Sequence, residues 1–286
     1  MALGKLGGNE LNYSSDIDLL GLWNDQIDTD SVREGGNHSK KEFVPQIMEG
    51  VRADLSNHTE EGYAYRVDLR LRPFGREGEL VPNLSGLLRY YRRSASLWEI
   101  QAALKMRPVA GNLKLGYEFL QKLRPVILEH RNRGKILDSI KKMRKMATDQ
   151  LSQDPSPALD VKSGIGGLRE VEFLVQGLQL IHGPDNPVLI EGGTLTGLDL
   201  LQDAGIVPEK AAVQLKDDYI FLRQTEHHLQ LLEDRQTHAL PKDPDQLTAL
   251  AKRMLGSDRE SDHFMEVLKD CLRRIHEAFQ TFLLDG

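Results

Sequence analysis

The feature that most constrains the fold is a ten-residue segment in which two kinds of side chain alternate. In Tyr63–Arg72, aromatic and aliphatic residues occupy every second position, and the positions between them are charged from Arg66 onward. Successive side chains of a β-strand point to opposite faces, so this pattern predicts a strand. The expected buried face consists of Tyr63, Tyr65, Val67, Leu69 and Leu71. The other face would carry one carboxylate, Asp68, among the guanidinium groups of Arg66, Arg70 and Arg72.

A second short segment places two more carboxylates on one face. Ser14–Leu20 is predicted to form a strand on which Asp16 and Asp18 point to the same side. Magnesium and manganese prefer oxygen ligands, and magnesium is commonly held by one or two carboxylates together with substrate phosphates. With Asp68 on a neighbouring strand, three carboxylates could hold two ions about 3.5–4 Å apart and clamp an in-line phosphoryl displacement. We therefore predict that Asp16, Asp18 and Asp68 are catalytic residues that bind Mg²⁺ or Mn²⁺.

A glycine turn precedes the first aspartates. Gly4–Gly8 contains three glycines, and paired glycines allow the backbone to approach a phosphate closely. The segment matches neither the phosphate loop that ends in Gly-Lys-Ser/Thr nor the dinucleotide-binding Gly-x-Gly-x-x-Gly pattern. Gly7 and Gly8 are predicted to contact phosphate, and a plain turn is the alternative.

Several blocks of the sequence resemble one known family. They are Gly4–Leu19, Val67–Gly75, Trp98–Glu99, Lys105–Gly111 and Asp160–Phe173. Together they resemble the nucleotidyltransferase motifs of glutamine synthetase adenylyltransferase, a bifunctional adenylylating and deadenylylating enzyme family. The resemblance implies an α/β (α+β) fold, in which a DNA-polymerase-β-like nucleotidyltransferase sheet with helices is followed by a C-terminal helical bundle.

The resemblance also implies a reaction. The family carries two related catalytic domains on one long chain, and this chain has room for one of them. Leu69–Gly75 and Gly166–Phe173 are more similar to the domain that removes AMP from a tyrosine of glutamine synthetase. The predicted reaction is phosphorolysis, with inorganic phosphate consumed and ADP released, in the regulation of nitrogen assimilation. Two alternatives stay open: transfer of AMP from ATP onto glutamine synthetase, and a non-catalytic regulatory module that binds glutamine synthetase, a nitrogen-signalling protein or a nucleotide.

Cationic residues near these motifs are candidates for binding phosphate. Arginine forks can hold phosphate oxygens in two-pronged contacts, although pairing with nearby acids is the structural alternative for Arg70 and Arg72. Lys105 and Arg107 could instead be solvated. Lys162 and Arg169 flank a glycine-rich helix start that could equally be an interdomain hinge. The predicted phosphate- or nucleotide-binding set is Gly7, Gly8, Ser15, Arg70, Arg72, Lys105, Arg107, Lys162 and Arg169.

Composition excludes other classes of function. The formal net charge is −6, and the sequence pI is about 5.9, which argues against a broad nucleic-acid-binding surface. No apolar run approaches the roughly 20 residues that a membrane helix needs. Cys271 is the single cysteine, so an internal disulfide is impossible and a reducing, cytoplasmic compartment is expected. The expected partners are glutamine synthetase, ADP or ATP, inorganic phosphate and a nitrogen-signalling regulatory protein, without nucleic acid or membrane.

The pattern predicts two domains. Residues 1–115 are expected to form the nucleotidyltransferase domain, N-terminally truncated because only three residues precede the glycine turn, and residues 116–286 a helical domain. Apolar spacing of three and four residues predicts helices over 40–57, 85–103, 167–182, 210–232 and 262–284. The polar stretch 24–41 is predicted to be a loop.

Overall fold

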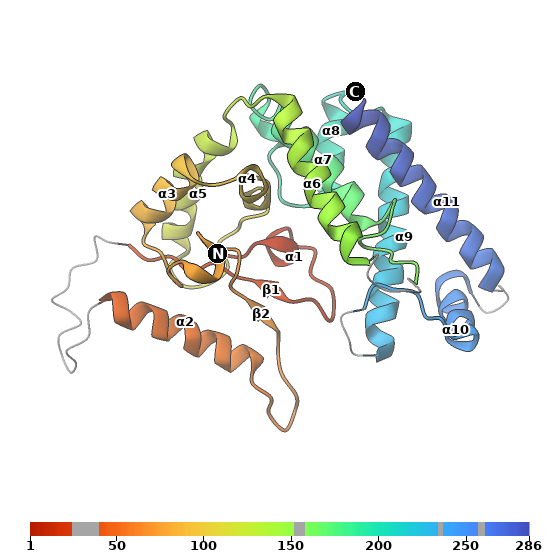
Figure 1. Ribbon diagram of the computed structural model, residues 1–286, viewed down its shortest axis with the longest axis horizontal. Coiled ribbons are helices and arrows are strands. Elements are labelled where there is room, and N and C mark those ends of the chain that lie inside the picture. The colour runs from red at the N-terminus through yellow and green to blue at the C-terminus, as the bar shows by residue number, and fades with distance from the viewer. Residues whose placement is uncertain (25–39, 152–157, 234–236, 257–260, 286) are drawn as a thin grey trace. The chain divides into compact units, whose positions relative to one another are not determined.

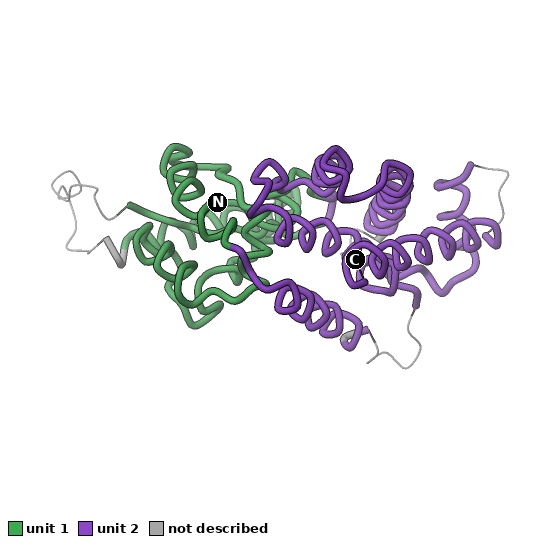
Figure 2. Tube along the Cα trace, turned by 90° about the horizontal axis from the view of Figure 1, so that it is seen from above, with its two compact units in different colours: residues 1–11, 15–129 green, residues 12–14, 130–286 purple. Residues whose placement is uncertain are grey.

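The computed structural model describes residues 1–24, 40–151, 158–233, 237–256 and 261–285 (Figure 1). Its contacts divide the chain into two compact units, which Figure 2 colours separately. Unit 1 comprises residues 1–11 and 15–129, and unit 2 comprises residues 12–14 and 130–286. The division along the chain therefore falls after Glu129, fourteen residues beyond the boundary expected from the sequence at 115. Most of the predicted loop over 24–41 lies outside the described residues.

Unit 1 contains a small parallel sheet. Strand β1 (Ile17–Asp18) pairs with strand β2 (Val67–Asp68), with Ile17 opposite Val67 and Asp18 opposite Asp68. The pairing of the two predicted segments is confirmed, but the expectation of strands over 14–20 and 63–72 is wrong in length. Strand β2 ends after Asp68 because the backbone N–H of Arg70 donates to the Asp68 side chain, 2.8 Å away.

The apolar face expected for the second strand is only partly buried. Leu69 is 8% exposed and Ile17 on β1 is 5% exposed, whereas Tyr65 is 40% exposed. Leu71 is intermediate. The expectation that all five apolar residues share a buried face is therefore wrong, because a strand of two residues orients only its own side chains and their immediate neighbours.

The other regular elements described in unit 1 are helical. They are α1 (Gly4–Gly7), α2 (Lys40–Ser56), α3 (Leu84–Arg93), α4 (Leu97–Ala103) and α5 (Leu113–Ile127), with a 3₁₀ turn η2 at Gly75–Glu77. The predicted helix over 40–57 is confirmed. The single helix expected over 85–103 is wrong, because Ser96 begins a new helix in a capping box with Glu99, whose carboxylate accepts the Ser96 N–H at 2.8 Å.

Unit 2 is helical apart from loops and an isolated bridge. Its helices are α6 (Arg133–Leu151), α7 (Leu168–His182), α8 (Thr194–Asp203), α9 (Glu209–Glu233), α10 (Pro244–Leu255) and α11 (Ser261–Phe279), with short helical turns at Pro187–Leu189 (η3) and Gln280–Leu284 (η4). The helices predicted over 167–182, 210–232 and 262–284 are confirmed. Among the described residues, no helix is long and apolar enough to cross a membrane.

Helix α7 forms the centre of unit 2 and packs against α6, α8, α9 and α11. Its Leu168, Val171 and Leu174 are fully buried. Gly177 permits the close approach of its neighbours, since a Cβ there would lie 2.7 Å from Leu283 and 2.9 Å from Ile140. A side chain at this position would therefore overpack the centre of the unit.

The single cysteine is part of this core. Cys271 on α11 is 1% exposed, and its Sγ lies 3.5 Å from the carbonyl oxygen of Asp218. Burial, followed by the nearby charge of Asp218, raises the pKa of the Cys271 thiol far above its ordinary value. The thiolate, which is the reactive form, is therefore scarce in the folded protein.

We predict that Cys271 is unreactive toward a thiol-specific disulfide reagent at pH 8 until the protein unfolds. Labelling followed against urea should begin only in the unfolding transition recorded by far-UV circular dichroism. The Cys271→Ser variant provides the unlabelled baseline. Rapid, complete labelling of the native protein would contradict this environment for the thiol.

Candidate active site

The carboxylates of unit 1 lie together on the small sheet. The parallel register sets Asp18 directly beside Asp68, and Asp16 precedes Asp18 by two residues. The pKa of the Arg70 guanidinium is raised first by its hydrogen bonds to Asp68 and also by the charges of Asp18 and Asp16. One arginine therefore lies close enough to interact with all three predicted metal ligands.

Two arginines hold two of these carboxylates in ion pairs. Arg66 donates from Nε to Asp16 Oδ1 at 2.6 Å and from its guanidinium to the Tyr63 hydroxyl at 2.8 Å. Arg70 donates to both oxygens of Asp68, at distances from 2.5 to 3.0 Å. Burial opposes ionisation of Asp68, but the hydrogen bonds and charge of Arg70 outweigh it and lower the pKa of this carboxyl. Asp68 is thus fully ionised at neutral pH.

The glycine segment forms the short helix α1 rather than a plain turn, and it packs against the carboxylate strand β1. Gly4 has φ +53°, and a Cβ there would lie 2.1 Å from Asp18 Oδ2. The backbone N–H of Leu3 donates to the Asp18 carbonyl at 2.9 Å. Gly7 faces the main chain of Lys105, and a Cβ at Gly7 would lie 2.0 Å from the Lys105 carbonyl oxygen. Gly7 and Gly8 are both buried. Gly4 therefore permits close packing beside Asp18, and Gly7 permits close packing against the main chain of Lys105.

Three other predicted cations have partners inside unit 1. Lys105 Nζ lies 2.6 Å from Glu10 Oε2, and the two side chains are only 7% and 12% exposed. Arg107 donates to the carbonyls of Leu6 and Gly7, at 2.8 and 3.2 Å. Arg72 donates to three carbonyl groups of the turn that follows β2, those of Leu69, Arg76 and Gly78. Lys105, Arg107 and Arg72 therefore stabilise the loops around the carboxylates.

Ser15, also predicted to bind phosphate, is buried, with 8% of its surface exposed.

The carboxylates fit a divalent cation by their chemistry. Hard oxygen donors on adjacent strand positions are the type of ligand that magnesium and manganese take. Within the described part of the chain, however, no three carboxylate, imidazole or thiol groups converge as a ready-made metal cluster. Asp16 and Asp68 are instead directed toward Arg66 and Arg70. A cation bound by Asp18 and Asp68 would therefore compete with Arg70 for the Asp68 oxygens.

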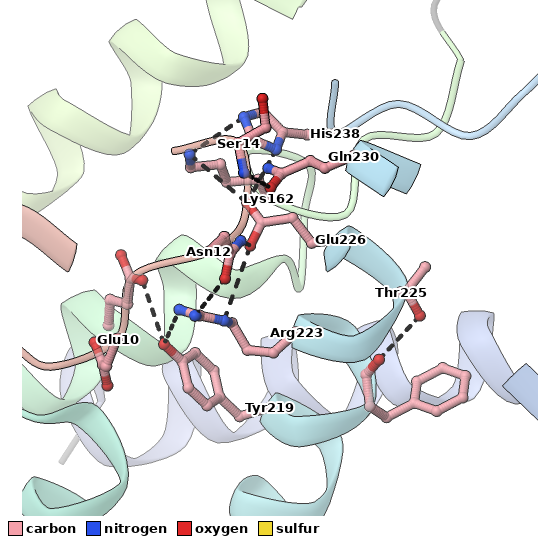
Figure 3. Close-up of polar contacts among 12 residues, drawn as sticks. Glu10, Asn12, Ser14, Lys162, Tyr219, Arg223, Thr225, Glu226, Gln230 and His238 are labelled. Carbon is pink, nitrogen blue, oxygen red and sulfur yellow. Dashed lines mark hydrogen bonds and ion pairs between the residues drawn. The ribbon is translucent and has the colours of Figure 1, made fainter. Parts of the chain in front are cut away.

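Lys162 and Arg169 belong to unit 2, where Lys162 joins a buried polar cluster around Glu226 (Figure 3). Glu226 on α9 is fully buried. Its Oε1 lies 2.9 Å from His238 Nδ1 and 3.7 Å from Lys162 Nζ. Lys162 Nζ is also 3.2 Å from His238 Nε2. A buried carboxylate needs such compensation, and Glu226 receives it from Lys162, from His238 and from Arg223, whose Nε lies 3.9 Å from Glu226 Oε2.

The short segment 12–14 belongs to the same unit through this cluster. The Asn12 side-chain amide donates to Glu226 Oε2, and its amide oxygen accepts from Arg223 at 2.5 Å. The Ser14 backbone N–H lies 3.4 Å from Gln230 Oε1. Figure 3 shows Arg223 pointing toward Asn12 and Glu226 from α9. One helix therefore binds both ends of a segment that ends two residues before Asp16 in the sequence.

Sequence reasoning did not assign several of these residues. The alternation predicts that Arg66 lies on the same charged face as Asp68, but no sequence motif assigns it to the site. Glu10 is 95 residues from Lys105, and Glu226 is 64 residues from Lys162. No local pattern marks such pairs, because only the tertiary fold brings them together.

Comparison with known proteins gives two family matches. Residues 1–122 match the family described as glutamate-ammonia ligase adenylyltransferase. Residues 135–283 match the family described as GlnD PII-uridylyltransferase. The first match contains all three aspartates, and the second contains Lys162, Glu226 and His238.

Individual relatives cover most of the chain. Each of three is named bifunctional glutamine synthetase adenylyltransferase/adenylyl-removing enzyme. The one from Hahella chejuensis is 36% identical over 94% of this chain and 29% of its own length. The one from Stenotrophomonas maltophilia is 39% identical over 84% of this chain and 26% of its own. The one from Streptomyces avermitilis is 38% identical over 100% of this chain and 28% of its own. The chain thus spans less than a third of the length of these relatives.

We predict that Arg70→Gln raises the pKa of Asp68, because the substitution removes the charge and the side-chain hydrogen bonds that favour the carboxylate. Carboxyl ¹³C shifts in a pH titration without divalent cations measure this pKa. Since the folded-state pKa lies below the unfolded one, ionised Asp68 stabilises the fold above the unfolded pKa, and this contribution is lost as the pH falls through the folded value. Arg70→Gln should therefore reduce the acid dependence of stability.

Arg72→Gln is the matched control for this titration, because Arg72 hydrogen bonds only to backbone carbonyls among the described residues. It removes the same charge two residues further along the chain and should leave the pKa of Asp68 nearly unchanged. Equal shifts in the two variants would contradict a specific Arg70–Asp68 interaction.

We predict that Glu226→Gln lowers the free energy of unfolding by about 3 kcal/mol, because it removes the charge that compensates the largely buried Lys162 and Arg223. The pair of Lys216 and Asp199, also in unit 2, provides the control, because the Asp199 side chain is 55% exposed whereas that of Glu226 is buried. Asp199→Asn should cost less than about 1 kcal/mol. Urea unfolding followed by far-UV circular dichroism measures both values, and equal losses would show that the Glu226 cluster does not stabilise the unit.

Proposed function

We propose that the chain, whose residues 1–122 match the glutamate-ammonia ligase adenylyltransferase family, is a metal-dependent nucleotidyltransferase of that family and removes AMP from adenylylated glutamine synthetase. The observation that carries the proposal is the register of β1 and β2, which sets Asp18 beside Asp68 next to Arg70. The relatives are named for both adenylylation and adenylyl removal. Removal is favoured here by the similarity of Leu69–Gly75 and Gly166–Phe173 to the removing domain of the family.

In the proposed reaction, an oxygen of inorganic phosphate attacks the phosphorus of the tyrosine-bound AMP. The bond from phosphorus to the tyrosine oxygen breaks, the tyrosine recovers its proton, and ADP leaves. Asp16, Asp18 and Asp68 would hold magnesium or manganese, which supplies charge neutralisation at the reacting phosphate when bound. Arg70, whose side chain is 62% exposed, can turn from Asp68 to a phosphate oxygen. Catalysis in this scheme depends on positioning and charge rather than on acid–base chemistry.

The remaining predicted residues take supporting roles in the proposal. Gly7, Gly8 and Ser15 are proposed to line the phosphate-binding side of the site, and Lys105 and Arg107 hold α1 in place through Glu10 and the carbonyls of Leu6 and Gly7. Lys162 and Arg169 are proposed as nucleotide or phosphate ligands from the second part of the chain. We propose residues 1–115 as the catalytic domain and residues 116–286 as a helical bundle. The description of the match over 135–283 names PII, which supports a PII-type nitrogen-signalling protein as the regulatory partner.

The second candidate is the adenylylating reaction, in which AMP moves from ATP to the same tyrosine. It would use the same carboxylates, and the names of the relatives include the adenylylating activity as well as the adenylyl-removing one. The two directions differ in what they consume. Removal requires inorganic phosphate and releases ADP, whereas addition requires ATP and releases pyrophosphate.

We predict phosphate-dependent release of ADP when the chain is mixed with adenylylated glutamine synthetase, magnesium and inorganic phosphate. Asp18→Asn should reduce the rate at least about 100-fold, because it removes a ligand of the metal that would neutralise the reacting phosphate. Asp54→Asn, an exposed aspartate on α2, should leave the rate unchanged. A parallel assay with unmodified glutamine synthetase and ATP tests the adenylylating direction. Wild-type turnover by Asp18→Asn would overturn the metal-binding role.

A further inference from the structure

Helices α3 and α5 of unit 1 lie side by side (Figure 1), and residues of both line a basic hollow on the surface. Its cavity volume is about 460 Å³. The lining residues are Ser85, Leu88, Arg89, Arg92 and Arg93 from α3 and Lys122 from α5. None of them belongs to the predicted nucleotidyltransferase site, so the hollow requires its own explanation.

The position of the arginines follows from the packing of α3. Asn83 caps the helix by accepting the Gly86 N–H at 2.6 Å. Four residues of α3 are buried, namely Leu84, Leu87, Leu88 and Tyr91. Helical spacing then directs Arg89, Arg92 and Arg93 to the opposite, exposed side. Because the buried side fixes the rotation of the helix, the three guanidinium groups are gathered within about one turn.

Within the described part of the chain, no carboxylate lies within salt-bridge distance of Arg89, Arg92 or Arg93. Other arginines of this acidic chain do have such partners, including Arg52, Arg66, Arg70, Arg144, Arg273 and Arg274. Lys122, the fourth cation of the hollow, also has one, Glu118 at 2.6 Å. Cations in the last turn of a helix interact favourably with the helix dipole. This interaction explains the presence of Arg92 and Arg93 near the end of α3, but not that of Arg89 in the middle of the helix.

We propose that this hollow binds a small polyanion that carries two or three linked phosphate groups. Guanidinium groups hold phosphate oxygens in pairs of parallel hydrogen bonds, and three of them match the charge of a diphosphate or triphosphate. The Ser85 hydroxyl adds a donor, and buried Leu88 adds an apolar contact. The volume lies within the range of about 300–1,000 Å³ typical of small-molecule sites, which favours a compact ligand over the flat surface of an acidic protein. This site is independent of the proposed adenylyl chemistry.

Isothermal titration calorimetry of the full chain with pyrophosphate, tripolyphosphate and ADP, in EDTA, tests the proposal. Removing divalent cations suppresses metal-dependent binding at the aspartates. We expect saturable binding with one site per chain for pyrophosphate or tripolyphosphate. The double substitution Arg89→Gln and Arg92→Gln should weaken it by at least about tenfold for each lost contact to a charged group. Glutamine retains helix propensity at these exposed positions, and circular dichroism checks the fold.

The matched control is Lys252→Gln with Arg253→Gln, two exposed cations on α10 that lie outside the hollow. It removes the same net charge and should leave the affinity within about twofold. Binding of ADP in addition, lost in the α3 variant, would identify a nucleotide as the source of the phosphates. The proposal is overturned if none of the three anions gives saturable binding, which is the result expected of a surface that binds an acidic protein instead. It is also overturned if the α3 variant and its control bind the anions equally well.

Discussion

The pairing of β1 with β2 is the interaction on which the candidate site depends. The Ile17 N–H donates to the Arg66 carbonyl, and the Leu19 N–H donates to the Asp68 carbonyl, both at 2.9 Å. A slip of one residue would turn the Asp68 side chain to the other face and separate it from Asp18. With only two residues in each strand, this register needs support from outside the sheet. Leu3 supplies part of it through its N–H bond to the Asp18 carbonyl, and buried Ile17 and Leu69 fix the opposite face.

Local pattern predicted the elements whose side-chain period extends over many residues. The helices over 40–56 and 168–182 followed from apolar spacing alone, and the adjacency of Asp18 and Asp68 followed from alternation. Strand length could not be predicted in the same way. It depends on where each backbone N–H finds its acceptor, and the Arg70 N–H binds the Asp68 side chain instead of a neighbouring strand. The break between α3 and α4 had a visible sign in the Ser96–Glu99 spacing, which the apolar periodicity obscured.

The cations of the predicted site differ in how much of each side chain is exposed and in which groups they bind. Lys105 forms a largely buried ion pair with Glu10, and Arg72 and Arg107 donate hydrogen bonds to backbone carbonyls. Removing such a group from its partner leaves a buried polar atom unsatisfied, which costs about 1–3 kcal/mol or more. The Arg70 side chain, by contrast, is largely exposed while its partner Asp68 is mostly covered. Among these four, Arg70 is therefore the cation that can exchange a carboxylate for a phosphate at low cost.

This asymmetry links metal binding to phosphate binding in the proposed reaction. Without a divalent cation, the positive charge beside Asp68 comes from Arg70, which keeps the carboxylate ionised. A cation held by the Asp68 oxygens would leave the Arg70 guanidinium free to bind a substrate phosphate beside the same carboxylates. Because each event favours the other, the two ligands should bind with positive coupling, and the coupling is reciprocal by thermodynamic necessity. Arg66 has less freedom, since its guanidinium bonds to the Tyr63 hydroxyl as well as to Asp16.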